Sequence, residues 1–308
     1  MKDTAMDGHV IRTRALTKRY GDLRAVDAVD LRVRSGDVYG FLGANGSGKT
    51  TTLRMLLGLV LPTSGEAEVL GMPMPAARRS VLPRVGSLVE SAAAYPHLSG
   101  SANLALLDAT GADRSPRLAR RAKIGTALEQ AGLDPADRRP VRTYSLGMRQ
   151  RLGLAAALMR RPELLILDEP SNGLDPHGIQ EIRQLLLQLN ASGTTIFLSS
   201  HLLAEIEQMC TRVGVLRGGR LILQEQLETL LRPTGLVAIR TPDADRCQAL
   251  IGAPVVSVEG DRLLVRARDP ARLNAYLVGE GVPVEEIGSY RRSLEEIVLE
   301  AEAGRDHR

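Results

Sequence analysis

Apolar and polar positions along the chain form two kinds of pattern, and each predicts a different kind of strand. Residues 10–33 alternate in short runs that break at Gly21 and Asp22, which predicts an antiparallel hairpin or small sheet. Other runs are apolar throughout, as is typical of strands buried on both faces of a parallel sheet. These runs cover residues 37–42, 164–167 and 194–198, and further short strands are expected at 65–70 and 85–89.

Helical spacing predicts much of the chain between these strands. Residues 51–57 carry apolar side chains at helical spacing, and residues 179–189 form an amphipathic helix between two buried strands, which makes a β-α-β unit. Helical segments also dominate from 101 to 161. Within them, Ser115 and Pro116 are expected as the N-cap and first-turn proline of a helix that ends near Gly132.

The pattern breaks at residues 232–235, and we place a domain boundary there. The remainder has the element order β-α-β-β-α-β, which is typical of a ferredoxin-like arrangement. Its expected strands cover residues 236–240, 255–258, 262–267 and 282–287, and its expected helices cover 243–251, begin at Asp269-Pro270 and begin at Ser293. The prediction is a large α/β domain over residues 8–231, with a helical part at about 91–160, and a small α+β domain over 236–303.

Composition narrows the class of protein. Of the 308 residues, 44% are apolar and 25% are charged, and no apolar run approaches the roughly 18 residues of a membrane span. The first residues are polar, unlike a secretory leader, and two distant cysteines support neither a disulfide framework nor a zinc site. We therefore expect a cytoplasmic protein. The net charge of +4 comes mostly from scattered arginines, read as solvated helix faces, and with aromatics at 3% no nucleic-acid partner is expected.

A glycine-rich stretch between an expected strand and an expected helix fits the phosphate-binding P-loop pattern G-x-x-x-x-G-K-[ST]. Glycines let consecutive backbone N–H groups approach phosphate oxygens at a helix N-terminus. Lys49 is expected to reach the β and γ phosphates, and the Thr50 hydroxyl to ligate Mg²⁺. The alternative is a glycine-rich surface loop that matches by accident. The candidate nucleotide-binding residues are Gly43, Ala44, Asn45, Gly46, Ser47, Gly48, Lys49, Thr50 and Thr51.

Two carboxylates, Asp168 and Glu169, follow the apolar run at 164–167. They therefore lie at the end of a buried strand, where α/β sheets bind their ligands. Beside a P-loop, Asp168 is interpreted as the Walker B carboxylate that holds Mg²⁺ through water. Glu169 is interpreted as the base that polarises the attacking water. A helix cap is the structural alternative for such a pair.

Residues 144–148, Tyr-Ser-Leu-Gly-Met, precede this strand and are followed by Arg-Gln-Arg. With these motifs in this order, residues 10–230 resemble the ATP-binding subunit of an ABC transporter. The five residues correspond to the family's L-S-G-G-Q signature: Ser145 and Gly147 match, whereas Tyr144, Leu146 and Met148 depart from it. The resemblance implies that this helix start completes the γ-phosphate site of an opposite subunit. Taken alone, the five residues would be a helix start and nothing more.

Further segments agree with the family in order and spacing, and one departs from it. The resemblance implies a D-loop aspartate at Asp175, a switch histidine at His201 that hydrogen-bonds the γ-phosphate and Glu169, and an adenine-stacking Tyr20. A surface or capping histidine and a packing tyrosine are the alternatives. Glu90 stands where ABC proteins usually carry glutamine. Together with the Tyr-Ser-Leu-Gly-Met segment, this departure resembles the bacitracin and lantibiotic self-protection subgroup and related drug exporters. Glu90 is either a Mg²⁺ ligand or a solvent-facing loop acid.

The resemblance implies an ATPase that binds ATP and Mg²⁺ and couples closure of a cassette dimer to export of an antibiotic, peptide or other amphipathic compound. A separate integral membrane permease would be the partner, docked against residues 91–142, with the chain peripheral on the inner face of the membrane. Two other classes stay open. One is a non-transport ABC ATPase acting on ribosomes or DNA, although this chain lacks a second cassette. The other is a regulatory binding module that acts through the C-terminal domain.

Overall fold

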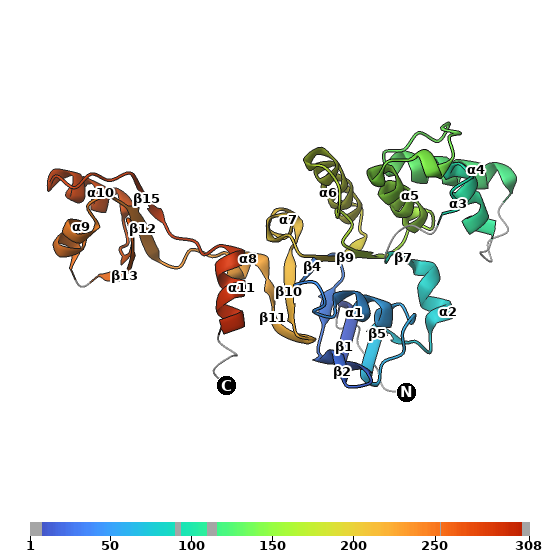
Figure 1. The fold of residues 1–308 in the computed structure, drawn as a ribbon, viewed down its shortest axis with the longest axis horizontal. Coiled ribbons are helices and arrows are strands. Elements are labelled where there is room, and N and C mark those ends of the chain that lie inside the picture. Colours follow the sequence, from blue (N-terminus) through green and yellow to red (C-terminus); the bar gives the residue numbers. More distant parts are fainter. Residues whose placement is uncertain (1–7, 90–93, 110–115, 253, 304–308) are drawn as a thin grey trace. The chain divides into compact units, whose positions relative to one another are not determined.

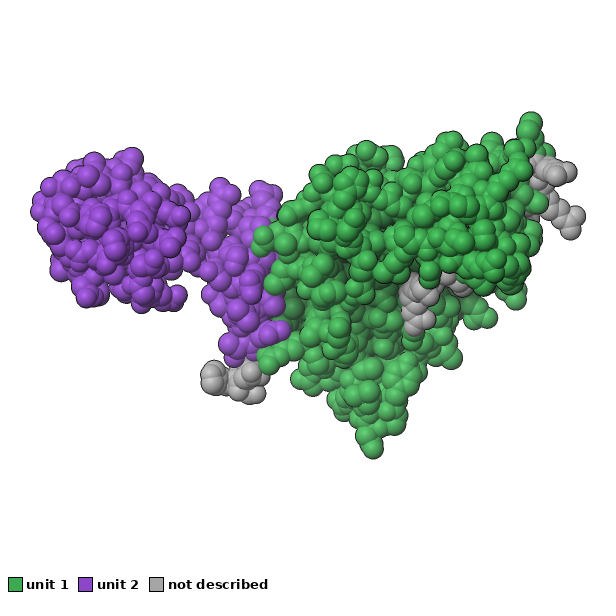
Figure 2. All heavy atoms as spheres, turned by 45° about the horizontal axis from the view of Figure 1, so that its top comes forward, with its two compact units in different colours: residues 1–227 green, residues 228–308 purple. Residues whose placement is uncertain are grey.

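The computed structural model describes residues 8–89, 94–109, 116–252 and 254–303. The chain divides into two compact units, residues 1–227 and 228–308, which Figure 2 distinguishes by colour. Among the described residues no helix has the length and apolar character that would let it cross a membrane. Because the placement of the units relative to each other is not determined, each is described by itself.

The centre of the first unit is a six-stranded sheet in the order β11-β10-β4-β9-β8-β7 (Figure 1). All adjacent pairs are parallel except β10 and β11. Every residue of β4 and β9 is buried, which confirms the prediction from their uninterrupted apolar runs. The strands are β4 (Val38–Leu42), β7 (Val85–Leu88), β8 (Leu164–Asp168), β9 (Thr195–Ser200), β10 (Arg212–Arg217) and β11 (Arg220–Gln226).

A second, antiparallel sheet contains the predicted N-terminal hairpin. Its path is β2-β1-β5-β6, and β3 pairs with β1 off this path. The hairpin turns at Gly21, which has a positive φ of 58°, a conformation that favours glycine. A Cβ atom at this position would meet no other atom within 4 Å, so the backbone conformation and not crowding is the reason for glycine here. The strands are β1 (His9–Tyr20), β2 (Leu23–Val29), β3 (Arg32–Arg34), β5 (Ser64–Val69) and β6 (Met72–Met74).

Helices cover the six-stranded sheet on both sides, with α6 and α7 on one side and α1 on the other (Figure 1). Helices α3, α4 and α5 form a separate apolar cluster centred on Leu104, Leu128 and Leu152. The helices of this unit are α1 (Lys49–Leu56), α2 (Arg78–Val81), α3 (Gly100–Ala109), α4 (Arg117–Gln130), α5 (Leu146–Leu158), α6 (Pro176–Ala191) and α7 (Leu203–Met209), with α8 (Leu227–Leu230) at its boundary. Two short 3-10 turns occur at Leu82–Arg84 and Val141–Thr143.

The second unit is an antiparallel sheet in the order β13-β14-β12-β15 with helices α9 and α10 in its connections. Its core joins Val237, Ile239, Leu263 and Leu277. The elements are β12 (Leu236–Arg240), α9 (Ala244–Ile251), β13 (Val255–Glu259), β14 (Arg262–Arg266), α10 (Pro270–Gly279), β15 (Glu286–Ser289) and α11 (Leu294–Ala303).

Three predicted details are wrong. The last strand begins at Glu286 instead of residue 282. The chain turns at Gly281 after α10, and the side chain of Val282 is then buried in the core before strand pairing begins. Pro116 is the N-cap of α4 and not its first-turn residue. Arg120 belongs to the run of arginines at residues 114–121 that was expected on a solvated helix face, but it donates at 2.8 Å to the buried carboxylate of Asp108.

Candidate functional site

The predicted P-loop lies between β4 and α1, as strand, loop and helix. Its backbone packs closely on neighbouring strands. At Gly48 a Cβ atom would collide with the carbonyl oxygen of Ala25 in β2, and at Gly43 it would collide with the carbonyl oxygen of Leu216 in β10. These close approaches require glycine at both positions and hold the loop against two different sheets.

Lys49, the first residue of α1, is buried, with 5% of its surface exposed. Its ammonium group donates to the carbonyl oxygens of Gly43 at 2.6 Å and Ala44 at 3.2 Å. It also lies 3.5 Å from a carboxylate oxygen of Glu169. A buried cation held in this way needs anionic partners, because its own desolvation is costly.

Asp168 ends β8, and its two carboxylate oxygens have different partners. Oδ2 accepts a hydrogen bond from the Thr50 hydroxyl at 2.7 Å, and Oδ1 accepts one from the Ser199 hydroxyl at 2.5 Å. Thr50 and Asp168, predicted from separate motifs as Mg²⁺ ligands, are therefore neighbours. Both are oxygen donors of the type that Mg²⁺ prefers.

Ser199 is a residue whose role the sequence reasoning missed. Its hydroxyl donates to Asp168 and accepts from the backbone N–H of Glu169 at 3.0 Å, so it positions both acidic residues. It lies on β9, where it is the register partner of Asp168 in the neighbouring parallel strand, and it is fully buried. A buried serine at the end of an otherwise apolar strand was the available signal.

Glu169 adopts an uncommon left-handed backbone conformation, with φ of 48°. Such conformations cost free energy and persist only where the surroundings impose them. One carboxylate oxygen faces Lys49, and the other lies 2.9 Å from Nδ1 of His201. The predicted base and the predicted switch histidine are thus in direct contact, and both side chains keep some exposure to solvent.

The predicted signature residues lie elsewhere in the first unit, at the start of α5. Ser145 is the N-cap, and its hydroxyl accepts from the backbone N–H of Met148 at 3.2 Å. The Leu146 side chain lies against Gly173 in the predicted D-loop, and Gly147 lies against Leu174. One turn further on, Gln150 donates to the backbone carbonyl of Glu169 at 3.4 Å. The structure therefore brings the signature and the segment after Walker B together within one chain.

The remaining predicted residues have different settings. Asp175 is exposed and caps α6, where its side chain accepts from Gly178 N–H at 2.9 Å. Tyr20 lies at the exposed end of the β1–β2 hairpin, with the Lys18 ammonium 4.9 Å from its ring centre. Glu90 lies outside the described residues.

The P-loop and the acidic strand end together suit a triphosphate and Mg²⁺. The hydroxyl oxygen of Ser47 in the loop is buried, and no described residue hydrogen-bonds to it. The N-terminus of α1 adds N–H groups with favourable partial charge toward an anion. Lys49 supplies positive charge, while Thr50 and Asp168 supply oxygen ligands. These groups can stabilise charge and orient water.

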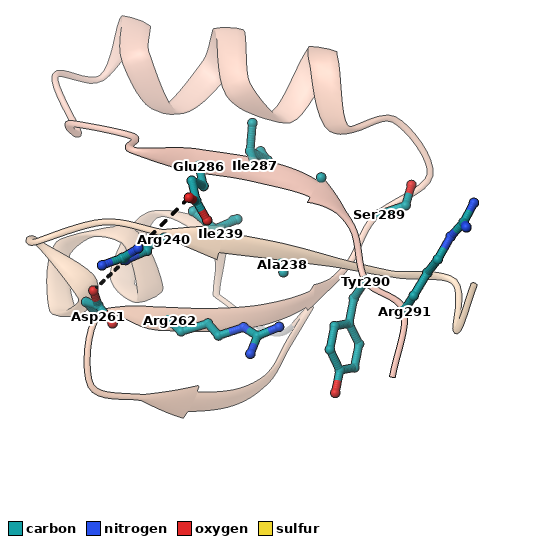
Figure 3. A pocket seen from close by; sticks show the side chains of 11 residues that line it. Ala238, Ile239, Arg240, Asp261, Arg262, Glu286, Ile287, Ser289, Tyr290 and Arg291 are labelled. Carbon is teal, nitrogen blue, oxygen red and sulfur yellow. Dashed lines mark hydrogen bonds and ion pairs between the residues drawn. The ribbon is translucent and has the colours of Figure 1, made fainter. Parts of the chain in front are cut away.

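A different polar hollow, of about 680 Å³, lies on the sheet of the second unit (Figure 3). Arg240 forms ion pairs there with Asp261 at 2.9 Å and Glu286 at 3.9 Å. The Arg262 guanidinium lies 5.2 Å from the centre of the Tyr290 ring. The predicted nucleotide-binding residues belong to the first unit, residues 1–227, whereas this hollow is lined by residues of the second unit.

Comparisons with known proteins agree with this geometry. A family model described as ABC transporter matches residues 26–172. The chain is 47% identical, over 69% of its length and 68% of the relative, to a bacitracin transport ATP-binding protein of Bacillus licheniformis. It is 37% identical to a daunorubicin resistance ATP-binding protein of Streptomyces coeruleorubidus, over 97% of this chain and 96% of the relative.

Solved structures share the fold of the first unit. One is cbiO1 from Clostridium perfringens, part of an ABC transporter complex, with 26% identity, a TM-score of 0.65, and coverage of 72% of this chain and 90% of that one. Another is a dimeric structure of a bacterial ABC transporter cassette, with 25% identity, a TM-score of 0.65, and coverage of 70% and 98%.

Proposed function

The chain belongs to the ABC transporter family as an ATP-binding and ATP-hydrolysing cassette, and on that premise we propose that it drives an exporter of antibiotics, peptides or other amphipathic compounds. Its relatives in bacitracin transport and daunorubicin resistance support this substrate class. A separate integral membrane subunit would provide the pathway, with this chain peripheral on the cytoplasmic face.

The observation that carries the proposal is that four residues lie together at the carboxyl ends of β4, β8 and β9: Lys49, Asp168, Glu169 and His201. Lys49 would bind the β and γ phosphates, and Thr50 and Asp168 would hold Mg²⁺, which when bound offsets phosphate charge. Glu169 would accept a proton from the attacking water. His201 would orient that carboxylate through their 2.9 Å contact and reach the γ-phosphate. Tyr20 would stack on the adenine ring.

Hydrolysis in this proposal requires two cassettes. Ser145 is exposed at the N-terminus of α5, where its hydroxyl and the helix dipole can face an anion. We propose that Ser145, Leu146, Gly147 and Met148 cap the triphosphate of a second cassette, and that Asp175 links the two sites. ATP binding would favour the closed dimer, and hydrolysis would allow it to reopen.

The helical region would hold the membrane subunit. Tyr95, Leu106 and Leu107 expose large apolar surface around a hollow there, which supports a contact with another protein.

We propose that Glu90, nearby in sequence, makes nucleotide binding more strictly Mg²⁺-dependent, because a carboxylate repels bare phosphate and binds Mg²⁺ more strongly than an amide. ATP affinity with and without Mg²⁺ should therefore differ less in Glu90→Gln than in the wild type. Equal Mg²⁺ dependence would exclude the role.

The C-terminal unit has a place in this proposal as an accessory domain with a ferredoxin-like fold. Its element order, β-α-β-β-α-β, and its antiparallel strand order β13-β14-β12-β15 support that fold.

Turnover as a function of protein concentration tests the proposed function. If two cassettes form the active site, ATPase activity per molecule should rise with concentration, and Ser145→Ala should abolish that rise while leaving ATP binding intact. Activity per molecule that is indifferent to concentration and to Ser145 would refute the shared site. Purification with an integral membrane protein would support transport, whereas sedimentation with ribosomes would favour a non-transport role.

A further inference from the structure

A second contact joins the two segments that carry Glu169 and His201. Two residues after Glu169, the Ser171 hydroxyl donates at 2.6 Å to Oε2 of Glu205, which lies in the first turn of α7. Ser171 is buried, with 8% exposure. Glu205 follows His201 by four residues, so this bond and the 2.9 Å Glu169–His201 contact connect the same two segments. The chain after Walker B and the chain after the switch histidine are therefore bonded to each other at two places.

The bond between Ser171 and Glu205 is shielded from water. Both residues line a small hollow whose other walls include the apolar side chains of Leu186, Leu198 and Met209. The second carboxylate oxygen of Glu205, Oε1, is buried, and no described residue hydrogen-bonds to it. A carboxylate in this setting depends on its few partners, because an unpaired buried charge is costly. Loss of the Ser171 hydroxyl would therefore leave both oxygens of Glu205 unpaired.

Helix α7 gives this bond a fixed point on the central sheet. Ile206, next to Glu205, is fully buried, and a Cβ atom at Gly40 in β4 would lie 2.6 Å from its Cδ1 atom. Glycine at that position lets the helix approach the strand closely. Just before α7, the Ser200 hydroxyl accepts from the Leu202 N–H at 2.9 Å, which holds the connection between β9 and the helix. Glu205 therefore projects from a helix that is packed against β4.

Ser171 also begins the turn that leads to the predicted D-loop aspartate. Its carbonyl oxygen accepts from the Leu174 N–H at 3.2 Å, and Asp175 then caps α6. On the other side, the carbonyl of Glu169 accepts from the Asn172 N–H at 3.1 Å. Because Glu169 starts this turn in a left-handed conformation, the place of Ser171 determines how the chain leaves the acidic strand end.

We propose that Glu205 is a positioning residue for ATP hydrolysis: by holding Ser171, it fixes the segment after Walker B relative to the helix that follows His201. This inference rests on the proposed function, in which Glu169 accepts the proton of the attacking water and His201 orients that carboxylate. It goes further by coupling the turn before the predicted D-loop aspartate to the switch histidine within one chain. The P-loop takes no part in the bond, so the role concerns turnover and not nucleotide affinity.

The first test removes the hydroxyl alone. Ser171→Ala leaves the Glu205 carboxylate without its donor, so turnover at saturating ATP should fall about tenfold, the effect of one hydrogen bond to a charged group. The KM for ATP should stay unchanged. Ser171→Thr keeps a hydroxyl at the same position and should retain most of the activity. Ser192→Ala is the matched control, because it removes a 2.8 Å hydrogen bond at the end of α6 in the same unit and should leave turnover unchanged.

The ring of His201 reports whether the effect is one of position. In Ser171→Ala the NMR signals of this ring, assigned with His201→Ala, should shift, because the Glu169 carboxylate that it contacts changes place. Ser192→Ala should leave these signals where they are. A double-mutant cycle of Ser171→Ala and Glu205→Ala should be non-additive in turnover, since either substitution breaks the same bond. If Ser171→Ala does not fold, Glu205→Gln keeps the shape, weakens the acceptor and should give a smaller fall in turnover with the same movement of the ring signals.

Glu169→Gln distinguishes failure of this inference from failure of the proposed function. If Glu169→Gln abolishes turnover but Ser171→Ala and Glu205→Gln match the wild type, the bond has no positioning role and the inference is overturned. Additive effects in the cycle, or a lower turnover with unmoved His201 signals, would also overturn it, because the bond would then serve only the fold. If Glu169→Gln itself keeps full turnover, Glu169 is not the base and the proposed function is wrong.

Discussion

Charged side chains cluster on both units of this protein, and the two clusters are built differently. At the carboxyl ends of β4 and β8 in the six-stranded sheet, Lys49 is 5% exposed and its neighbour Glu169 is 20% exposed. On the antiparallel sheet of the second unit, Arg240 and Asp261 are each about half exposed, at 50% and 52% (Figure 3). Both clusters contain a cation within ion-pair distance of a carboxylate, so composition alone does not distinguish them.

The difference in burial indicates different roles. Charges in the interior are costly unless partners offset the lost hydration, and the first cluster adds a left-handed backbone at Glu169 to that cost. Exposed ion pairs such as Arg240–Asp261 cost little and contribute little. A fold retains a buried, strained charge cluster where chemistry needs it, and the sequence comparisons place the ATPase family on that same unit.

Glu169→Gln should give the largest effect of any single substitution in either cluster. The amide side chain keeps the shape of the carboxylate but cannot accept the water proton, so turnover should fall about 10³-fold, within the range for loss of a general base. ATP binding should persist, and the variant should accumulate as a closed ATP-bound dimer. ATPase assays and size-exclusion chromatography measure these outcomes, with Glu286→Gln in the second unit as the matched control. A monomer with undiminished hydrolysis would contradict the assignment.

Much of this first cluster could be predicted because its motifs are local. The glycines of the P-loop and the carboxylates after an apolar run are each readable from a few adjacent residues, whereas His201 was expected only from the resemblance to the ABC transporter family. Ser199 was not predicted, because its role depends on β9 lying beside β8 in register, which is a tertiary fact. The same limit applies to Arg120, whose partner Asp108 lies on another helix.

The second unit shows where periodicity alone misleads. Val282 and Val284 alternate with other residues as in a strand, yet Val282 packs into the core directly after a positive-φ glycine, Gly281, and pairing begins only at Glu286. Strand pairing decided the boundary, and the alternation in sequence did not.

Lys49→Ala should give the second largest effect. It removes the buried cation that faces the P-loop carbonyls and Glu169, leaving that carboxylate without its partner and the phosphates without their counter-charge. We expect nucleotide affinity to fall about 100-fold, as for breaking a buried ion pair. Titration with a fluorescent ATP analogue measures it, and Arg240→Ala removes an equal charge from the exposed cluster as a control. Normal affinity in Lys49→Ala would refute the P-loop assignment.

Ser199→Ala should give an intermediate effect, since it acts through two other residues. Loss of the hydroxyl removes one hydrogen bond to Asp168 and one to the backbone of Glu169, so turnover should fall about tenfold. If Asp168 holds Mg²⁺, the half-saturating Mg²⁺ concentration should rise as well. Ser289→Ala, on the second unit's sheet, should leave both quantities unchanged. An unaltered Mg²⁺ dependence together with unaltered turnover would show that Ser199 only fills space.

Arg240→Ala should give the smallest effect, and this effect should appear in a titration and not in ATPase activity. A hydrogen bond from Arg240 lowers the pKa of Asp261 below its ordinary value, so the pair favours the folded state above that ordinary value and loses this contribution as the pH falls through the lowered pKa. The substitution should therefore raise the Asp261 pKa toward its ordinary value, as followed by NMR titration of the carboxylate. At neutral pH the variant should be slightly less stable than the wild type, and the two should converge in acid. Turnover should not change, because this charge cluster is solvated and lies outside the unit that carries the nucleotide motifs. A large loss of ATPase activity would mean that the exposed cluster has a catalytic role. Burial would then not distinguish the catalytic cluster from the structural one.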